Sequence, residues 1–399
     1  MSANASYCRT SCPPLGEGSS YSSLYIHVPF CAAKCDYCGF YSECDTGERH
    51  QAYLSRLFEE MRTHSSQCRQ LKSIFVGGGT PSMLSPREWR GMFSVISECF
   101  ALAPNCEITA EANPESLSTD HIKCWAELGI NRVSLGIQAF NEKDRRLIGR
   151  QGTLDRLPQI VRELDAAGVM RRNFDLIFNL PGQSLQVWRD ALQQALDLGA
   201  THISTYELMI EDGTPLAKRG FKGGDEEAFL RFWDATEEFL EAAGLHRYEI
   251  SNFARKNEEC RHNLDIWKGG TYLGCGPAAW SFDGKERRGN APSIARWLNH
   301  ARQELDALPP EQRAAEILAF GLRLVNGWQW REYESITGYD AREFRGAQLE
   351  ECRRHGLVTL TDEGVAPTSQ TPSRCGRRVC WTAWTATATA FPMPRRNLR

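Results

Sequence analysis

Three cysteines in one short segment are the residues of this sequence whose type and spacing point most directly to chemistry. Cys31, Cys35 and Cys38 have C-x3-C-x2-C spacing, and they follow an apolar run that is typical of a strand. Three thiolates on one loop can bind three irons of a [4Fe–4S] cluster, which normally has four protein ligands. The fourth iron would then be open to an exchangeable ligand, as catalytic metal sites are.

Two other interpretations of these cysteines stay open, namely a structural zinc site and buried thiols without a ligand. A zinc site would need a fourth close ligand. Cys44 and His27 are nearby, but His27 falls inside the expected strand and neither residue belongs to a second C-x2-C pair. We expect the other twelve of the 15 cysteines to be ordinary buried or surface thiols.

The elements that must position this loop follow from six short apolar runs that alternate with amphipathic stretches. The runs lie at residues 23–28, 73–76, 107–111, 132–136, 173–178 and 201–206. Helical patterns lie between them, and one begins with Ser85 as N-cap, Pro86 and a capping-box Glu88. Because parallel strands are connected by right-handed crossovers, six such units predict an α/β fold with a parallel sheet in an open or partial barrel.

The overall composition excludes several classes of protein. An odd number of cysteines in 399 residues is unlike a small secreted disulfide scaffold and favours a reducing compartment. No apolar run approaches the ~18 residues of a membrane span, and the net charge of −3 gives no general basic surplus for nucleic acid. Residues 1–22 are Ser-rich without an apolar signal core, which predicts a disordered leader and no secretory signal. We expect a cytoplasmic protein. A mitochondrial transit peptide stays open.

The end of the chain has a different character from the six units. After a break at residues 308–312, a helical stretch at 314–324 and a hairpin-like stretch at 356–364 predict a small second domain at 309–366. Residues 367–399 contain no acidic residue and six arginines, so this tail carries +6 while the body carries −9. The tail is atypical, and we expect it to be disordered. A basic nucleic-acid arm and a frame-shifted end are the alternatives, and we expect no nucleic-acid partner.

The cysteine loop resembles that of the radical S-adenosylmethionine (SAM) superfamily, in which SAM chelates the open iron of the cluster. The stretch at 76–82 resembles the superfamily's "GGGTP" loop, which implies that Gly78, Gly79 and Thr80 face the methionyl amine of SAM. Polar residues at or beyond the ends of strands match its other SAM contacts, as expected where ligands bind parallel α/β folds. The resemblance thus implies cofactor contacts by Tyr25, Tyr37, Glu111, Gln138, Arg150 and Asp175.

Within this superfamily, residues 23–365 resemble the coproporphyrinogen dehydrogenase group and, in it, the HemW-type haem chaperones. The motifs that carry the resemblance lie at 25–31, 180–183, 202–208, 247–253 and 260–267. Phe40 stands where the dehydrogenases have a fourth cysteine, which favours a chaperone that binds haem and transfers it to an acceptor protein. An oxygen-independent coproporphyrinogen III dehydrogenase is the alternative, and a cluster-containing radical methylase is a weaker one. Whether the chain is an enzyme stays open at this point.

The resemblance also implies a domain plan and a haem site. A partial (β/α)6 TIM-like barrel would occupy 23–250, a linking region 251–308, and a helical, winged-helix-like HemN C-terminal domain 309–366. His262, in a His-Asn motif, is the expected haem ligand, with Cys275 as an alternative, because Gly152 and Trp280 stand where the family has further histidines. Haem or porphyrin, an electron donor and an acceptor protein, which could be membrane-associated, are the implied partners.

Overall fold

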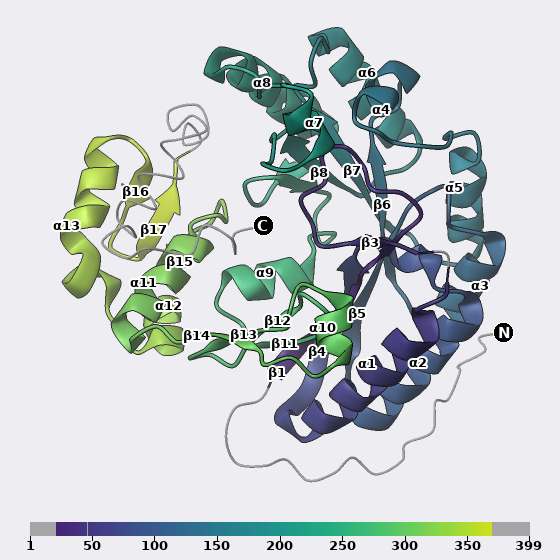
Figure 1. Cartoon of the computed structure of the whole chain (residues 1–399). Coiled ribbons are helices and arrows are strands. Elements are labelled where there is room, and N and C mark those ends of the chain that lie inside the picture. The colour runs from purple at the N-terminus through teal and green to yellow at the C-terminus, as the bar shows by residue number, and fades with distance from the viewer. Residues whose placement is uncertain (1–20, 46, 369–399) are drawn as a thin grey trace, which may run out of the picture.

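The computed structural model describes residues 21–45 and 47–368. The expected tail at 367–399 and the leader at 1–22 therefore lie almost entirely outside the described residues, and the structure does not bear on them. Within the described part, a twelve-stranded sheet forms the centre of the molecule, and a smaller body follows it at the C-terminal end (Figure 1).

The predicted α/β fold with a parallel sheet is confirmed. Six adjacent parallel strands form the middle of the large sheet, in chain order. They are β1 (Tyr21–Val28), β4 (Cys68–Gly78), β5 (Leu102–Ala112), β6 (Arg132–Gln138), β7 (Arg171–Phe178) and β8 (His202–Glu207). Each contains one of the six apolar runs, because a strand buried under helices is apolar on its outer face.

Helices connect these strands and cover the outer face of the curved sheet (Figure 1). They are α1 (His50–His64), α2 (Pro86–Cys99), α3 (Thr119–Glu127), α4 (Glu142–Leu147), α5 (Leu157–Ala166) and α6 (Leu185–Asp197), and α8 (Glu226–Ala242) follows the last of these strands. The short α7 (Pro215–Lys218) instead lies beside the cysteine loop, where the Leu216 amide donates to the Asp36 carbonyl over 3.1 Å. Ser85 caps α2 in the predicted capping box, with its side chain accepting from the Glu88 amide. The capped start fixes where the chain leaves the glycine loop and enters the helix.

Residues 251–308, which we expected as a linking region, extend both edges of the large sheet. β10 (Asn252–Ala254) continues it antiparallel beyond β8 and pairs in turn with β9 (His246–Arg247), which precedes this region in the chain. At the other edge, β11 (Tyr272–Cys275) pairs parallel with β1, and three antiparallel strands follow it. These are β12 (Trp280–Phe282), β13 (Arg287–Gly289) and β14 (Glu304–Asp306), with the helices α9 (Arg261–Trp267) and α10 (Ile294–Leu298) in the same stretch.

The C-terminal body has its own apolar core, which includes Trp328, Tyr333 and Leu349. It comprises α11 (Pro310–Gly321), α12 (Trp330–Thr337) and α13 (Ala341–Arg354) with a sheet of β15 (Trp328–Gln329), β17 (Gly364–Pro367) and β16 (Val358–Leu360). α11 begins four residues before the stretch we predicted as helical, because a proline is well tolerated in the first turn. The Val325 amide donates to the Tyr248 carbonyl over 3.0 Å and joins this body to the large sheet.

The inner face of the large sheet is polar. In β7, Asn173 and Asp175 alternate with the buried Phe174 and Leu176, so the two kinds of side chain lie on opposite faces. Polar side chains of neighbouring strands bond one another on the inner face, as Asn173 Nδ2 does with Ser134 Oγ over 2.7 Å. This face therefore resembles the lining of a binding site more than an apolar core.

Candidate functional site

The three predicted cluster cysteines lie in the segment between β1 and α1. Cys31 ends the short β2 (Phe30–Cys31), which pairs with β3 (Glu43–Cys44), while Cys35 and Cys38 lie in the turn between them. All three thiols are half-buried, and burial raises the pKa of Cys31 and of Cys38. Among residues 21–45 and 47–368, no three metal-binding side chains converge as the ligands of a single ion must. A [4Fe–4S] cluster instead places each thiolate on a different iron.

Two polar contacts join this cysteine loop to the glycine loop after β4 and to the segment after α4. Thr80 Oγ1 donates to Cys31 Sγ over 3.5 Å, and Arg150 Nη1 donates to Cys35 Sγ over 3.6 Å. Both donors would favour a thiolate over a neutral thiol, because a hydrogen bond from a donor stabilises the charged form. The structure thus brings the cysteine loop together with two residues that the sequence assigned to SAM.

The glycine loop after β4 lies against the end of β1 and the start of the cysteine loop. The Gly79 amide donates to the Val28 carbonyl over 2.8 Å, and the Thr80 amide donates to the Phe30 carbonyl over 2.7 Å. Gly78 has a φ of 110°, and a Cβ there would lie 2.7 Å from the His27 ring. A Cβ on Gly79 would lie 2.8 Å from the Phe30 carbonyl oxygen. Only glycine fits this close approach of two chain segments.

Glu111 and Asp175 are the acidic residues of the site. The Gly78 amide donates to Glu111 Oε2 over 3.0 Å. Burial and, second, the negative charge of Asp175 raise the pKa of Glu111 to about 8. Burial also raises the pKa of Asp175, although hydrogen bonds from Asn173, Ser204 and Ser134 act in the opposite direction. Because these bonds favour an ionised Asp175 and its charge favours a protonated Glu111, the two carboxyl groups can differ in protonation at neutral pH.

Gln138 has a left-handed backbone conformation with a φ of 68°, which is unusual for a residue with a side chain. The pairing of β6 with β7 shifts register between Gly136 and Gln138, so the residue lies at a β-bulge. Bulges re-aim a side chain at the end of a strand, and backbone strain of this kind is common in binding sites.

Arg150 connects three parts of the site. Its Nη2 donates to Asn113 Oδ1 and to the Gly136 carbonyl, and its Nη1 reaches Cys35. The Nε of Arg150 is buried and has no hydrogen-bond partner in the described structure. One donor of a buried guanidinium is therefore available to a bound anionic group.

The remaining predicted residues at the barrel mouth are aromatic. The Tyr25 hydroxyl lies 3.0 Å from His27 Nδ1, and His27 Nε2 lies 3.0 Å from the Tyr41 carbonyl oxygen. Since that oxygen can only accept, Nε2 carries the hydrogen, and burial lowers the pKa of His27 to about 4. Tyr37 packs beside the apolar cluster that contains Ile148. His27 thus uses both ring nitrogens within the protein and leaves neither for zinc.

The predicted haem ligand lies elsewhere. His262, in α9, is 3% exposed, and its Nδ1 lies 2.8 Å from Ser73 Oγ. Burial lowers the pKa of His262 to about 4, and the His262 amide donates to Glu107 Oε1 over 3.0 Å. Ser73 precedes Gly78 by five residues in β4, so about 16 Å of strand separates His262 from the glycine loop. The structure does not bring His262 together with the cysteine loop. The alternative ligand Cys275 is also fully buried.

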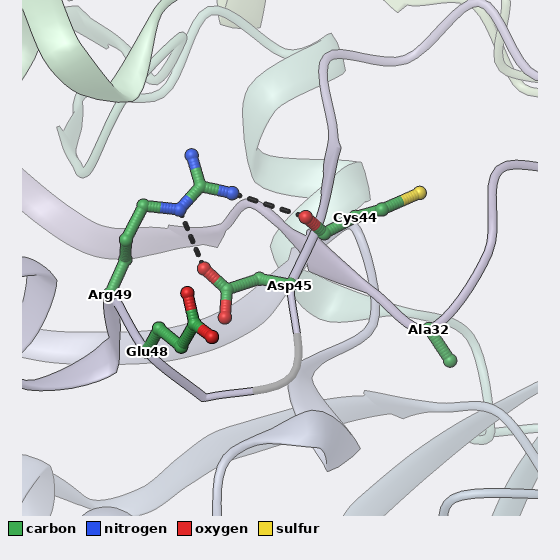
Figure 2. Close-up of a pocket in the computed structure, with 5 residues that line it drawn as sticks. All are labelled: Ala32, Cys44, Asp45, Glu48 and Arg49. Carbon is green, nitrogen blue, oxygen red and sulfur yellow. Dashed lines mark hydrogen bonds and ion pairs between the residues drawn. The ribbon is translucent and has the colours of Figure 1, made fainter.

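A pocket of about 200 Å³ lies beside the cysteine loop but is lined by other residues, namely Ala32, Cys44, Asp45, Glu48 and Arg49. Figure 2 shows Arg49 bonded to Asp45 and to the Cys44 carbonyl, with the Cys44 thiol directed away from it. None of the residues predicted to bind a cofactor lines this pocket. The predicted site is instead the mouth of the barrel.

Several polar residues at and beneath the site were not predicted from the sequence, among them Asn113, Ser134, Asn173 and His202. For Asn173 and His202 a signal was available, because polar residues recur at every second position of β7 and β8, in strands that otherwise read as buried. A period of two in such a strand indicates a polar inner face. The sequence-based prediction considered only the residues near the strand ends.

Comparisons with known proteins agree with this arrangement. A sequence model of the Radical SAM superfamily matches residues 25–195, and a model of the HemN C-terminal domain matches residues 308–370. The heme chaperone HemW of Lactococcus lactis is 31% identical over 358 residues, which span 86% of this chain and 94% of that protein. The chain belongs to the HemW-type branch of the radical SAM superfamily.

Other relatives of this HemW-type chain are similar over much of their length. The heme chaperone HemW of Escherichia coli is 35% identical over 64% of this chain and 69% of its own. The mitochondrial radical S-adenosyl methionine domain-containing protein 1 of Danio rerio is 30% identical over 86% and 83%. Among solved structures, the coproporphyrinogen III oxidase HemN of Escherichia coli has a TM-score of 0.80 over 94% of this chain and 91% of that one. At 21% identity this last likeness shows the fold.

Membership of the superfamily implies a [4Fe–4S] cluster and SAM, and the residues at the barrel mouth fit both. Three half-buried thiols share one loop, a glycine loop approaches them without side chains, and the buried Arg150 Nε has no hydrogen-bond partner among the described residues. In the part of the chain that the structure describes, no helix combines the length and hydropathy of a membrane span.

Proposed function

We propose that this chain is a haem chaperone, which binds haem and transfers it to an acceptor protein while it carries a [4Fe–4S] cluster and SAM. The observation that carries the proposal is the 31% identity over 94% of a protein named as a heme chaperone. Phe40 supports it, because a cysteine at this position would complete the motif of the dehydrogenases. Its side chain is 55% exposed, so it is not required for the apolar core.

The cofactor sites follow from the contacts at the barrel mouth. Cys31, Cys35 and Cys38 would hold the cluster, which supplies a redox centre with one exchangeable iron. Thr80 and Arg150 already donate to two of these thiols and would orient them. The backbone of Gly78 and Gly79 would approach SAM, and its other contacts would come from the remaining site residues. These are Tyr25, Tyr37, Glu111, Gln138 and Asp175.

The proposed haem ligand is His262. Since it is buried, haem could reach its ring only if α9 moved away from β4, where Ser73 and the Phe75 ring, at 5.3 Å, now hold the imidazole. The proposal includes an electron donor for the cluster and an acceptor for haem, which could be membrane-associated. It includes a cytoplasmic location, with a mitochondrial one as the alternative, since one relative's name contains the word mitochondrial.

The second candidate is an oxygen-independent coproporphyrinogen III dehydrogenase, and the match of residues 308–370 to the HemN C-terminal domain favours keeping it. With both cofactors bound, such an enzyme oxidatively decarboxylates propionate side chains to vinyl groups. In that case the chain's own residues would orient the propionate at the barrel mouth and exclude water from it.

One experiment separates the two candidates. The full chain is reconstituted anaerobically with iron and sulfide, and it is then incubated with SAM, a reductant and coproporphyrinogen III. In parallel, haem is titrated and its absorption is followed. The chaperone proposal expects stoichiometric haem uptake and no protoporphyrinogen. Protoporphyrinogen formed by the wild type but not by Cys35→Ser would overturn it, with Cys44→Ser as the matched control outside the proposed ligand set.

A further inference from the structure

Beneath Asp175, a chain of buried hydrogen bonds continues across the inner face of the sheet. Asn173 Nδ2 donates to Asp175 Oδ1 over 2.8 Å. On its other side, Asn173 Oδ1 lies 2.6 Å from His202 Nδ1. His202 Nε2 lies 2.8 Å from the hydroxyl of Tyr248, in the loop after β9, and the two rings are 5.5 Å apart. Four side chains from three segments thus form one continuous path.

The positions of the hydrogens along this path follow from elementary chemistry. An ionised carboxylate can only accept, so the Asn173 amide presents its NH2 to Asp175 and its oxygen to His202. This oxygen also accepts from Ser204 Oγ over 3.0 Å, which agrees with that orientation. His202 Nδ1 must therefore carry a hydrogen, and Nε2 of the neutral ring accepts from Tyr248. The Tyr248 oxygen in turn accepts from the Cys260 amide over 3.3 Å.

The surroundings of His202 keep its ring neutral. The side chain is 1% exposed, and the charged groups that face it are the guanidinium groups of Arg132 and Arg171. Burial lowers the pKa of His202, and these two cations lower it further. A neutral imidazole with one donor and one acceptor gives the path a single direction, in which every donor points toward Asp175.

Asp175 retains acceptor capacity on the side away from this path. Oδ1 holds the bond from Asn173, and Oδ2 accepts from Ser134 Oγ over 3.1 Å. Ser204 is also within hydrogen-bonding reach of Asp175, but the single hydrogen of its hydroxyl is donated to Asn173 Oδ1 in this path. Each carboxylate oxygen has two lone pairs, so one on each oxygen is left for a ligand. Two adjacent hydroxyl groups, as in a vicinal diol, match two adjacent acceptors of one carboxylate.

We propose that His202 is a positioning residue, held as the Nδ1–H tautomer between Tyr248 and Asn173. His202 fixes the Asn173 amide, and this amide keeps Asp175 oriented as the acceptor of a vicinal diol. The diol is the ribose of SAM, and the inference to this extent rests on the proposed function. A buried histidine with only a packing role would stabilise the fold without any preference for the diol.

The first test measures the binding of SAM and of its 2′,3′-dideoxy analogue to the reconstituted full chain by equilibrium dialysis. Tyr248→Phe and Asn173→Leu each remove one link of the path. Tyr333→Phe is the matched control, because it removes a buried hydroxyl that donates to the Ala314 carbonyl in the C-terminal body. We expect the wild-type preference for SAM to fall about fivefold in the first two variants and to persist in the control.

The outcomes distinguish the two proposals. If the wild type binds SAM and all variants keep the same preference, the positioning role is wrong while the SAM site stands. If the wild type binds neither compound, the SAM site itself fails, and this inference fails with it. A variant that weakens both compounds equally has a general defect of the fold, and that outcome also refutes the positioning role.

A second test reads the tautomer directly in the wild-type chain and uses a variant only for assignment. Long-range 1H–15N NMR of the ¹⁵N-histidine-labelled chain, with the cluster oxidised, distinguishes the two ring nitrogens of its nine histidines. Tyr248→Phe shifts the Nε2 signal of His202 and so assigns it. We expect a neutral ring with the hydrogen on Nδ1 at pH 7. A hydrogen on Nε2, or a charged ring, would overturn the inference.

Discussion

Glu111 offers a quantitative test of the electrostatics at the barrel mouth. Its carboxyl group lies beside Asp175, and burial with that charge raises its pKa from 4.5 to about 8. The folded chain therefore binds a proton that the unfolded chain releases between these two pH values. The contribution of protonated Glu111 to the free energy of unfolding is therefore fully present below pH 4.5 and is lost as the pH rises toward 8.

The substitution Glu111→Gln removes the titration while it keeps the shape of the side chain. Each pH unit between 4.5 and 7 corresponds to about 1.4 kcal/mol, so full burial would give a loss of about 3 kcal/mol at pH 7. Since Glu111 keeps some contact with solvent, we reduce this to about 2 kcal/mol. A glutamine still accepts the Gly78 amide, and we expect the variant to be more stable than the wild type by this amount.

Urea unfolding of the SAM-free chain at pH 5, 7 and 8.5 measures the effect. The difference between Glu111→Gln and the wild type should be small at pH 5 and should grow as the pH rises. Glu127→Gln is the matched control, because Glu127 is 60% exposed and forms a surface ion pair with Arg90. A difference that stays constant from pH 5 to 8.5 would show that Glu111 ionises normally and would refute the raised pKa at the barrel mouth.

Three further predictions concern the glycine loop, the cluster and the base of the barrel. Gly78→Ala should lower the free energy of unfolding by about 1–3 kcal/mol, because the added Cβ would meet the His27 ring at a positive φ. An unchanged midpoint of urea unfolding would contradict this prediction. Cys35→Ser should abolish the iron–sulfur absorption after reconstitution, whereas Cys44→Ser should retain it; equal absorption in both would refute the ligand assignment. Glu107→Gln should lower the free energy of unfolding by about 3 kcal/mol above pH 5, since it leaves neighbouring arginines without their counter-charge. Urea unfolding should show that this deficit shrinks as the pH falls, because these cations lower the pKa of Glu107. A deficit independent of pH would exclude a role for the charge of Glu107.

The position of His262 bears on how a chaperone of this kind could hold haem. The ring is buried between Ser73 and Phe75, and Glu107 accepts from the first amides of α9. Haem ligation by this residue therefore requires α9 to leave the base of the barrel. Under our proposal, haem binding and the stability of α9 are coupled, and Glu107 is one of the residues that hold α9 in place.

Local sequence was enough to predict the six parallel strands, the capped start of α2 and the cysteine loop. Each depends on residues close in the chain, such as the β-branched content of a short apolar run or the Ser85 cap. The glycine loop was also identified, although the reason for its glycines was not. Only the fold places the His27 ring and the Phe30 carbonyl within 3 Å of the positions their Cβ atoms would take.

The tertiary structure decided what distant segments do to one another. Residues 251–308 have short apolar runs that carried no strand signal, yet β11 pairs parallel with β1 and continues the sheet toward β12, because only the folded chain brings these distant segments together. The strain at Gln138, the pKa of Glu111 and the path from Tyr248 to Asp175 all arise between residues far apart in sequence. The sequence by itself determined which side chains could bind a cluster, since spacing on one loop is a local property, while its resemblance to a family supplied the candidates for SAM. The folded sheet decided which polar residues support them and that His262 lies apart from the cysteine loop, because only the folded sheet brings side chains of separate strands together.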